Sequence, residues 1–293
     1  MAKKGFAHLH VHTEYSMLDG AARLSDLFTH TRELGMDSIA TSDHGFLFGA
    51  FDFWRQAKAN DVKPIIGVEA YLTPGTHRSD RSRVRWGDGS RDDVSGGGAY
   101  THMTMWAETT EGMHNLFRAS AIASLEGQLY KPRMDREVLQ TYSKGLIATT
   151  GCPSGEIQTR LRLGQYQEAV AAAAEFRDIF GKGNFYCEVM DHGLSIEKNV
   201  AADLMRLAKE LDLPFVATND LHYTKHEDYN AHAALLCVQS GSTLEDPNRF
   251  KFDADNFYLR SPEEMYSIFG DIPGACENTL EIAERCNAEL NTK

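Results

Sequence analysis

Three histidines alternate with apolar residues near the start of the chain, within the stretch GFAHLHVHTEYSMLDG. Successive side chains of a β-strand point to opposite faces, so His8, His10 and His12 are predicted to share one face, and Asp19 follows a short way on. A buried row of neutral imidazoles costs free energy unless each ring finds a partner. The pattern therefore predicts that other polar groups or metal ions lie against this face.

Residues with the same chemistry stand at the ends of five further predicted strands. They are His44 in SDHG, Glu69 in GVEAY, His102 in YTHMTMW, Cys152 in TTGC, and Asp220 with His222 in NDLH. Added to His10, His12 and Asp19, they form a set of nine possible metal ligands. Nine ligands are too many for one ion and suit two or three, with carboxylates shared between closely spaced cations. Closely spaced cations of this kind can stabilise both the attacking and the leaving oxygen of an in-line displacement.

The elements that would position these residues alternate along the chain. Short apolar or β-branched runs are followed by helical patterns, as in AHLHVHT before LSDLFTHTRELG. Seven strand-then-helix units in a row predict an α/β fold with parallel strands, and they favour a closed seven-stranded (β/α)7 barrel over an open sheet. In barrels of this kind the functional residues gather at the C-terminal rim of the strands, which is where the nine residues fall.

Composition restricts the class of protein further. The chain has 293 residues, is 42% hydrophobic and has a net charge of −12, the wrong sign for a module that grips duplex DNA by charge alone. Its five cysteines are scattered rather than paired, which is typical of a reduced, cytoplasmic protein. No run is apolar enough to span a membrane, so no membrane partner is expected.

Two residues are candidates for supporting the ligands from behind. Asp43, beside His44, would orient a ligand or relay a proton, or it would only cap the following helix. His8 lies one step deeper than His10 along the same strand. It would either touch the site indirectly or be an ordinary buried histidine.

A stretch rich in Gly, Ser, Arg and Asp, residues 75–98, has no apolar period and predicts a surface insertion. Its arginines are either solvated side chains of a loop or a patch that steers DNA phosphates toward the site. They are Arg78, Arg81, Arg83 and Arg85.

The motifs HLHVHTEYSMLDGA, TSDHG, GVEAY, TGCPSGE and ATNDLHY resemble those of PHP (polymerase and histidinol phosphatase) domains. More narrowly, they resemble the N-terminal PHP domains of bacterial replicative DNA polymerase III alpha subunits of the actinobacterial type. The resemblance implies a PHP-type barrel with three divalent metal ions, zinc in the first place and manganese as the alternative. It implies one ion on His10, His12 and Asp220, a second on His102 and Cys152 with Glu69 bridging the two, and a third on Asp19, His44 and His222.

The resemblance also implies a function, a proofreading 3′–5′ exonuclease that acts on single-stranded or mismatched DNA 3′ ends. Residues 1–270 would form the PHP domain, and residues 271–293 an exit helix toward a polymerase palm that this sequence does not contain. In the longer parent, a DNA-directed DNA polymerase, the partners would be the remaining polymerase domains and other replisome subunits. Two alternatives stay open, a metal-stapled scaffold without catalysis and a phosphatase of the histidinol-phosphate type.

Overall fold

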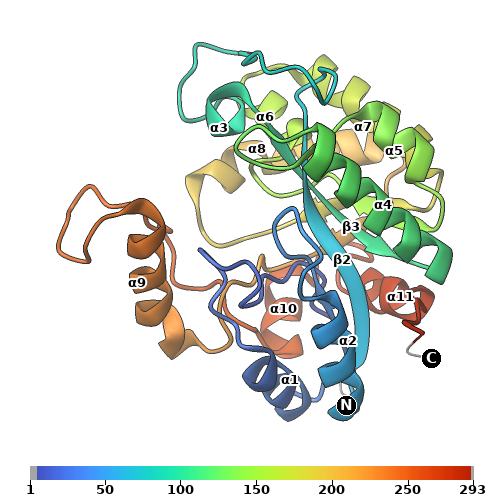
Figure 1. Cartoon of the computed structure of the whole chain (residues 1–293), viewed down its shortest axis with the longest axis vertical. Coiled ribbons are helices and arrows are strands. Elements are labelled where there is room, and N and C mark those ends of the chain that lie inside the picture. The colour runs from blue at the N-terminus through green and yellow to red at the C-terminus, as the bar shows by residue number, and fades with distance from the viewer. Residues whose placement is uncertain (1–4, 292–293) are drawn as a thin grey trace.

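A curled sheet with helices around it forms the body of the molecule in the computed structural model, which describes residues 5–291 (Figure 1). The outer ends of the predicted segments 1–270 and 271–293 therefore lie outside the described residues. The strands are β1 (Ser38–Thr41), β2 (Lys63–Leu72), β3 (Thr101–Ala107), β4 (Arg133–Met134), β5 (Leu146–Thr149), β6 (Phe185–Val189) and β7 (Phe215–Ala217). Their order in the sheet is β1-β2-β3-β5-β6-β7, and β4 pairs with β2.

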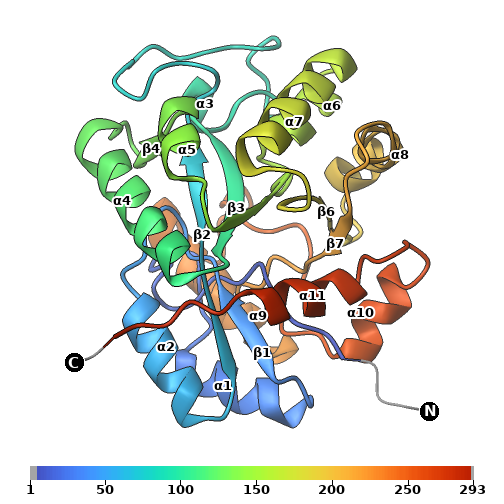
Figure 2. The same cartoon turned by 90° about the vertical axis from the view of Figure 1, so that its right-hand side faces the viewer.

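Helices follow most strands and cover the outside of the sheet (Figure 2). The first six are α1 (Leu24–Glu33), α2 (Ala50–Ala59), α3 (Ser95–Gly98), α4 (Thr110–Glu126), α5 (Arg136–Tyr142) and α6 (Glu156–Arg162). The others are α7 (Tyr166–Phe180), α8 (Ser195–Glu210), the 3₁₀ turn η1 (His226–Asp228), α9 (Tyr229–Ser240), α10 (Pro262–Phe269) and α11 (Glu277–Arg285). None of the helices in the described range is long and apolar enough to cross a membrane.

Local sequence signals fix where several helices begin. The Thr109 side chain accepts a hydrogen bond from the backbone N–H of Gly112 at the start of α4, and Asp135 caps α5 in the same way. At α10, Ser261 and Glu264 form a reciprocal capping box around Pro262 in the first turn. These caps satisfy backbone donors that no helical carbonyl can reach.

The predicted seven-stranded fold class is confirmed, but the prediction of parallel strands throughout is wrong at β3. This strand is antiparallel to both β2 and β5. A parallel return needs a crossover of a dozen or more residues, usually a helix, and the insertion between β2 and β3 contains only the four-residue α3. The chain therefore re-enters the sheet at the end where β2 left it, and His102 reaches the rim from the beginning of its strand.

Residues 8–12 complete the open side of the curled sheet. They form no regular strand, but His8 makes a parallel bridge to Ile39 and Val11 makes one to Leu221. Backbone hydrogen bonds from Ala40 to His8 (2.8 Å) and from Leu221 to His10 (3.0 Å) flank the segment on both sides. The first residues of the fold thus connect β1 with the chain that follows β7.

An apolar cluster fills the end of the barrel opposite His102. It contains Leu9, Ile65 and Trp106, and α11 adds Ile282 and Ala283 to it. This helix therefore covers the bottom of the barrel. Within the predicted exit segment 271–293 the helix itself is Glu277–Arg285, and the role of the segment as a connection toward a polymerase palm stays a prediction.

The insertion 75–98 has little regular structure, as predicted, yet it is firmly attached to the barrel. Asp93 accepts backbone hydrogen bonds from Trp86, Gly87 and Gly89 and so organises the loop from inside. The guanidinium of Arg133 is buried under the loop, where it donates to the carbonyls of Ala99, Arg78, Asp80 and Gly127. These bonds hold the loop in a fixed conformation on the barrel.

Candidate metal centre

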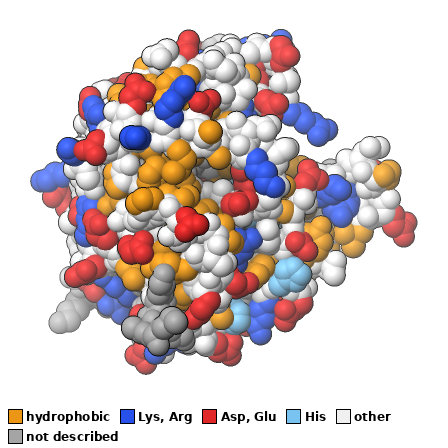
Figure 3. Space-filling model, turned by 180° about the vertical axis from the view of Figure 1, so that it is seen from behind, with side chains coloured by type: hydrophobic (Ala, Val, Ile, Leu, Met, Phe, Trp, Pro, Cys, Tyr) orange, Lys and Arg blue, Asp and Glu red, His pale blue; other side chains and the backbone are white. Residues whose placement is uncertain are grey.

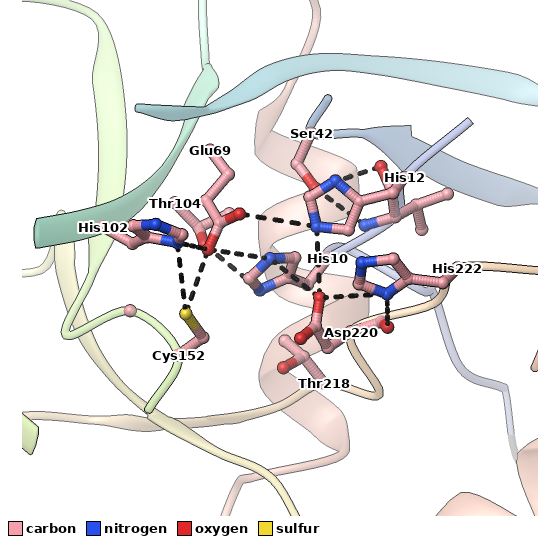
Figure 4. A network of polar contacts seen from close by, with 12 residues as sticks. His10, His12, Ser42, Glu69, His102, Thr104, Cys152, Thr218, Asp220 and His222 are labelled. Atoms are coloured by element: carbon pink, nitrogen blue, oxygen red, sulfur yellow. Dashed lines mark hydrogen bonds and ion pairs between the residues drawn. The ribbon is translucent and has the colours of Figure 1, made fainter. Parts of the chain in front are cut away.

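All nine predicted ligands meet at one end of the barrel, and Figure 4 shows seven of them pointing toward one another. The segment 8–12 and its following loop supply His10, His12 and Asp19. The loop after β1 supplies His44, β2 supplies Glu69 and β3 supplies His102. Cys152 follows β5, and Asp220 and His222 follow β7. The convergence of these residues therefore agrees with the sequence prediction, whereas their role as ligands stays a prediction.

Glu69 lies at the centre of the cluster and is almost fully buried. One carboxylate oxygen lies 2.9 Å from Nδ1 of His102 and 3.1 Å from Sγ of Cys152. The other lies 2.7 Å from Nδ1 of His44 and 3.5 Å from Nε2 of His12. A single carboxylate thus faces ligands from four different segments of the chain.

Asp220 contacts the histidines on the other side of the cluster. Its Oδ1 lies 3.3 Å from Nε2 of His10 and 3.1 Å from Nε2 of His12. The Asp220 backbone has φ = 43°, in the left-handed region that residues other than glycine rarely occupy. Strain of this kind is found where the surrounding structure must aim a functional side chain.

The remaining ligands lie on the open side. Asp19 Oδ2 is 3.2 Å from Nε2 of His44. The ring of His222 packs on the ring of His12 with centroids 4.4 Å apart, and the rings of His12 and His44 stack at 4.1 Å. Close stacking of three imidazoles places their nitrogens around a common space.

Buried polar atoms without partners show that this space suits cations. Nε2 of His10 and His12, Nδ1 of His44, Oε2 of Glu69 and Oδ1 of Asp220 have no hydrogen bond of acceptable geometry among the described residues. Such atoms are costly when buried, and five of them around one space are what metal ligation would satisfy. The mixture of imidazole, carboxylate and thiol suits borderline-soft divalent metals.

Among the nine predicted ligands, three groups of residues bring their ligand atoms within 4.8 Å of one another. They are His10, His12 and Asp220; His12, His44 and His222; and His44, Glu69 and His102. The first group matches one of the sets that the family resemblance implies. The other two overlap with the implied sets but exchange members, because His44 lies between Glu69 and Asp19.

Glu188, on β6, is a supporting residue that the sequence analysis missed. It is fully buried, and its Oε1 accepts a hydrogen bond of 2.7 Å from Nδ1 of His10. Thr149 and Thr218 donate to the same carboxylate. With its Nδ1 proton donated to Glu188, His10 directs Nε2 toward the centre, where it could bind a cation in place of a proton. The signal in the sequence is an acidic residue inside the apolar run NFYCEVMD.

Asp43 is a buried anchor behind the site. Its carboxylate accepts hydrogen bonds from the Thr13 backbone and from the hydroxyls of Thr13, Ser16 and Thr41. Ser16 in turn lies 3.3 Å from Nδ1 of His12. Asp43 therefore supports a predicted ligand through one hydroxyl, and it does not cap a helix.

Charges within the cluster balance each other despite burial. Burial alone would raise the pKa of Glu69, but His102 and His44 hold it well below its usual range. Burial opposes protonation of His10, yet Asp220 and Glu188 raise its pKa well above the ordinary value. Burial and the neighbouring Glu69 raise the pKa of the Cys152 thiol. Despite burial, Asp19 and Glu69 likewise raise the pKa of His44, so the protons of His10 and His44 occupy the place that divalent cations would take, and metal binding would release them.

His8 is not part of the centre. It packs against the ring of Phe6, and its Nε2–H donates to the carbonyl of Arg260 at 2.8 Å. Its Nδ1 is buried without a partner among the described residues, so the imidazole is neutral. Of the two alternatives in the sequence, the ordinary buried histidine is the one that fits.

His8 gives the fold a pH dependence that can be measured. Burial lowers its pKa to about 4, whereas the unfolded chain has a value near 6.5. As pH falls through 6.5 the imidazole is protonated in the unfolded state but stays neutral in the folded state. The free energy of unfolding at pH 5 is therefore about 2 kcal/mol lower than at neutral pH. In urea denaturation with chelator present, the free energy of unfolding of His8→Gln should fall less than that of wild type between pH 7.5 and 5. A variant at the exposed His114, His114→Gln, should lose as much as wild type. Identical pH slopes for His8→Gln and wild type would contradict this role.

The four arginines of the insertion have different surroundings. Arg78 forms ion pairs with Glu126, Asp135 and Glu137, at 2.7–3.0 Å, so its guanidinium is structural and the prediction that it steers DNA is not supported. Arg83 contacts the loop and a tyrosine instead of a carboxylate. Arg81 and Arg85 make no ion pair within the described residues.

The centre opens to solvent through a mouth of about 420 Å³. Apart from predicted ligands, the mouth is lined by Tyr71, Ser95, Gly96, Tyr100, Lys131, Ser154, Gln239, Phe250 and Phe252. Cavities of roughly 300–1,000 Å³ hold small-molecule ligands, so a single nucleotide is a suitable occupant. Aromatic side chains and one lysine thus surround the entrance to a cluster of carboxylates and imidazoles.

A second cavity, between α8 and α10, lies elsewhere. It is lined mainly by apolar side chains such as Val200, Leu204 and Phe269, and it contains none of the nine predicted ligands. These helices belong to the face seen in Figure 3, where an apolar patch is bordered by side chains of both charges. Its charged lining residues, Asp191, Glu197 and Lys198, belong to none of the groups in the described chain that could hold a metal ion, so this cavity is not the candidate reactive site.

Comparison with known proteins places the chain among proteins with these motifs. The PHP domain family matches residues 8–192. The chain is 55% identical over 290 residues to the DNA polymerase III subunit alpha of Saccharopolyspora erythraea, covering 96% of this chain and 24% of that protein. It is 54% identical over 288 residues to the same subunit of Mycobacterium tuberculosis, covering 97% of this chain and 24% of that protein. The chain thus spans about a quarter of the length of these relatives.

Among solved structures, the fold resembles that of a Bifidobacterium adolescentis protein described as a metal-dependent phosphoesterase. The TM-score is 0.42 and the sequence identity 16%, with 76% of this chain and 88% of that chain covered. At this level the likeness concerns the fold alone.

Proposed function

The chain belongs to the PHP family, and from this premise we propose that it is the metal-dependent 3′–5′ exonuclease domain of a DNA polymerase III alpha subunit. Its substrate would be a single-stranded or mismatched DNA 3′ end. We assign residues 1–270 to the PHP domain and the following segment to the connection with the remaining polymerase domains. The high identity to alpha subunits supports this assignment.

One observation carries the proposal, namely the set of partnerless buried atoms beneath a mouth of nucleotide size. Each of the nine ligand positions of the motif holds a residue that can bind a metal, so no ligand has been replaced. We propose three divalent ions, zinc in the first place and manganese as the alternative, on His10, His12, Asp19, His44, Glu69, His102, Cys152, Asp220 and His222. When bound, the ions would supply an activated water and stabilise the charge on the phosphodiester oxygens.

The chain's own residues would prepare this chemistry. Glu188 orients His10, and Asp43 fixes the Ser16 hydroxyl beside His12, so both rings keep one nitrogen free for the centre. The narrow mouth would exclude a paired terminus and admit a frayed one. Selectivity for mismatched ends follows from that difference.

A primer assay tests the proposal. We expect a 5′-labelled oligonucleotide with an unpaired 3′ end to shorten from that end at low salt with zinc or manganese, releasing nucleoside 5′-monophosphates. Chelation and Asp220→Asn should abolish shortening, whereas the exposed Glu245→Gln should leave it unchanged. No nucleotide incorporation is expected from this chain.

Two outcomes would point to the alternatives. An unchanged primer with folded, metal-loaded protein would favour a scaffold role in which the ions only hold the barrel together. Rapid hydrolysis of a small phosphate monoester such as histidinol phosphate, without action on the oligonucleotide, would favour a phosphatase.

A further inference from the structure

A strained tyrosine stands beside the mouth, in the turn between α4 and β4. Tyr130 has φ = 61°, a backbone conformation that is unfavourable for a bulky side chain. It is nevertheless 68% exposed, so no packing of its ring repays the strain. Strained residues that project into solvent cluster at functional sites, where they present a side chain.

One cation contacts this ring, and a second follows it in the sequence. The guanidinium of Arg83 lies 5.0 Å from the Tyr130 ring centroid and donates a 2.7 Å hydrogen bond to its hydroxyl. Lys131 follows directly in sequence, with its Nζ 5.2 Å from the ring centroid of Tyr71. Neither cation has a carboxylate within ion-pair distance in the described part of the chain. In a protein of net charge −12, two cations without a carboxylate partner near one exposed tyrosine favour the binding of an anion.

These residues lead directly into the candidate metal centre. Lys131 and Gly96, whose carbonyl accepts a hydrogen bond from Arg83, both line the mouth. Tyr71, beneath Lys131, packs against the rings of His44 and His102 with centroids 5.9 and 5.1 Å apart. The Lys131 ammonium is thus separated from the predicted ligands by a single aromatic ring.

We propose that Tyr130, Arg83 and Lys131 form a guide for single-stranded DNA that directs the 3′-terminal segment into the mouth. A base stacks on the face of Tyr130 that Arg83 leaves open, and Arg83 and Lys131 bind the neighbouring phosphates. Aromatic platforms beside basic side chains are how proteins bind single strands without reading their sequence. The inference rests on the proposed exonuclease function and specifies how its substrate is bound.

Binding can be measured separately from hydrolysis. With the metal-free whole chain in chelator, fluorescence anisotropy of a labelled oligothymidylate should report roughly tenfold weaker binding for Tyr130→Asn, a variant that tolerates the left-handed backbone but lacks the ring. Tyr130→Phe keeps the stacking face and should bind like wild type. Lys182→Met, an exposed lysine paired with Asp212, is the matched control for charge.

Salt dependence tests the phosphate contacts. Lys131→Met should lower the slope of log affinity against log salt by about 0.7, the value for one phosphate contact on a single strand, and Lys182→Met should not. In the metal-loaded protein, Tyr130→Asn and Lys131→Met should raise KM for the primer about tenfold with kcat within twofold.

The two proposals fail in different ways. If the primer is shortened but these variants match Lys182→Met in affinity, salt slope and KM, the proposed guide is wrong and the proposed exonuclease function is supported. If the variants lose binding as expected while wild type shortens no primer, the guide stands and the exonuclease is wrong.

Discussion

Replacing Glu69 with glutamine should lower the rate of 3′-terminal hydrolysis by more than about 100-fold. Loss of a residue that only supports a ligand costs about 10–100-fold, and Glu69 itself faces His10, His12, His44, His102 and Cys152. The amide keeps the shape of the side chain but removes the charge that would hold two cations near each other. Primer shortening and elemental analysis, measured on the same preparation, report the loss of rate and of metal.

His222→Asn is the comparison that identifies the bridging role. His222 contacts the cluster from one side, through His12 and Asp220, so its loss should affect one ion and cost less activity than Glu69→Gln. The exposed Glu245→Gln controls for the change from acid to amide. Equal rates for Glu69→Gln and His222→Asn would show that Glu69 does not bridge.

Removal of metal should lower the melting temperature by roughly 5–10 °C for each ion that is lost. A ligand at about a thousand times its dissociation constant stabilises the folded state by about 4 kcal/mol per site, and a chain of this size shifts by roughly 2 °C per kcal/mol. The stabilisation is large because the ligands tie together the first strand segment, β2, β3 and the loops after β5 and β7. Differential scanning calorimetry before and after chelation, with readdition of zinc, measures the shift.

The Glu69→Gln variant makes this measurement specific. Its melting temperature should change less than that of the wild type when chelator is added, because the two ions that Glu69 would bridge are already lost. A wild-type protein that contains metal but melts unchanged after its removal would contradict a structural contribution of the centre.

The convergence of the nine side chains could be predicted because it depends on short-range rules. The alternation of His10 and His12 and the strand-end positions of Glu69 and Asp220 require only the period of a strand and the polarity of a barrel. Glu188 could not be found in this way, because it lies inside β6 and its role depends on contact with a ring 178 residues earlier in the chain. Asp43 could be named as a supporting candidate because it stands beside His44, and its contact with Ser16 spans only 27 residues.

The directions of strands and the contact partners of side chains were harder to predict than the positions of the strands and ligands in the sequence. The reversal of β3 depends on where the insertion returns the chain, which no local pattern encodes. The role of Arg78 depends on three carboxylates from other segments, so composition alone left it open. Likewise, the apolar face of α11 predicts burial, but not that the buried surface would be the bottom of the same barrel.

The way residues 8–12 complete the sheet sets the order in which the protein can be assembled during synthesis. This segment is synthesised long before the residues that it contacts: it pairs with Leu221, and the neighbouring Ala7 N–H bonds to the Thr279 hydroxyl 272 residues away. Contacts of such sequence separation form late and slowly, because the intervening chain must be ordered first. Two of the histidines most deeply buried in the finished centre therefore spend translation exposed, and the centre cannot be complete until almost the whole domain has emerged. A nascent chain halted earlier would carry reactive imidazoles with no fixed partner.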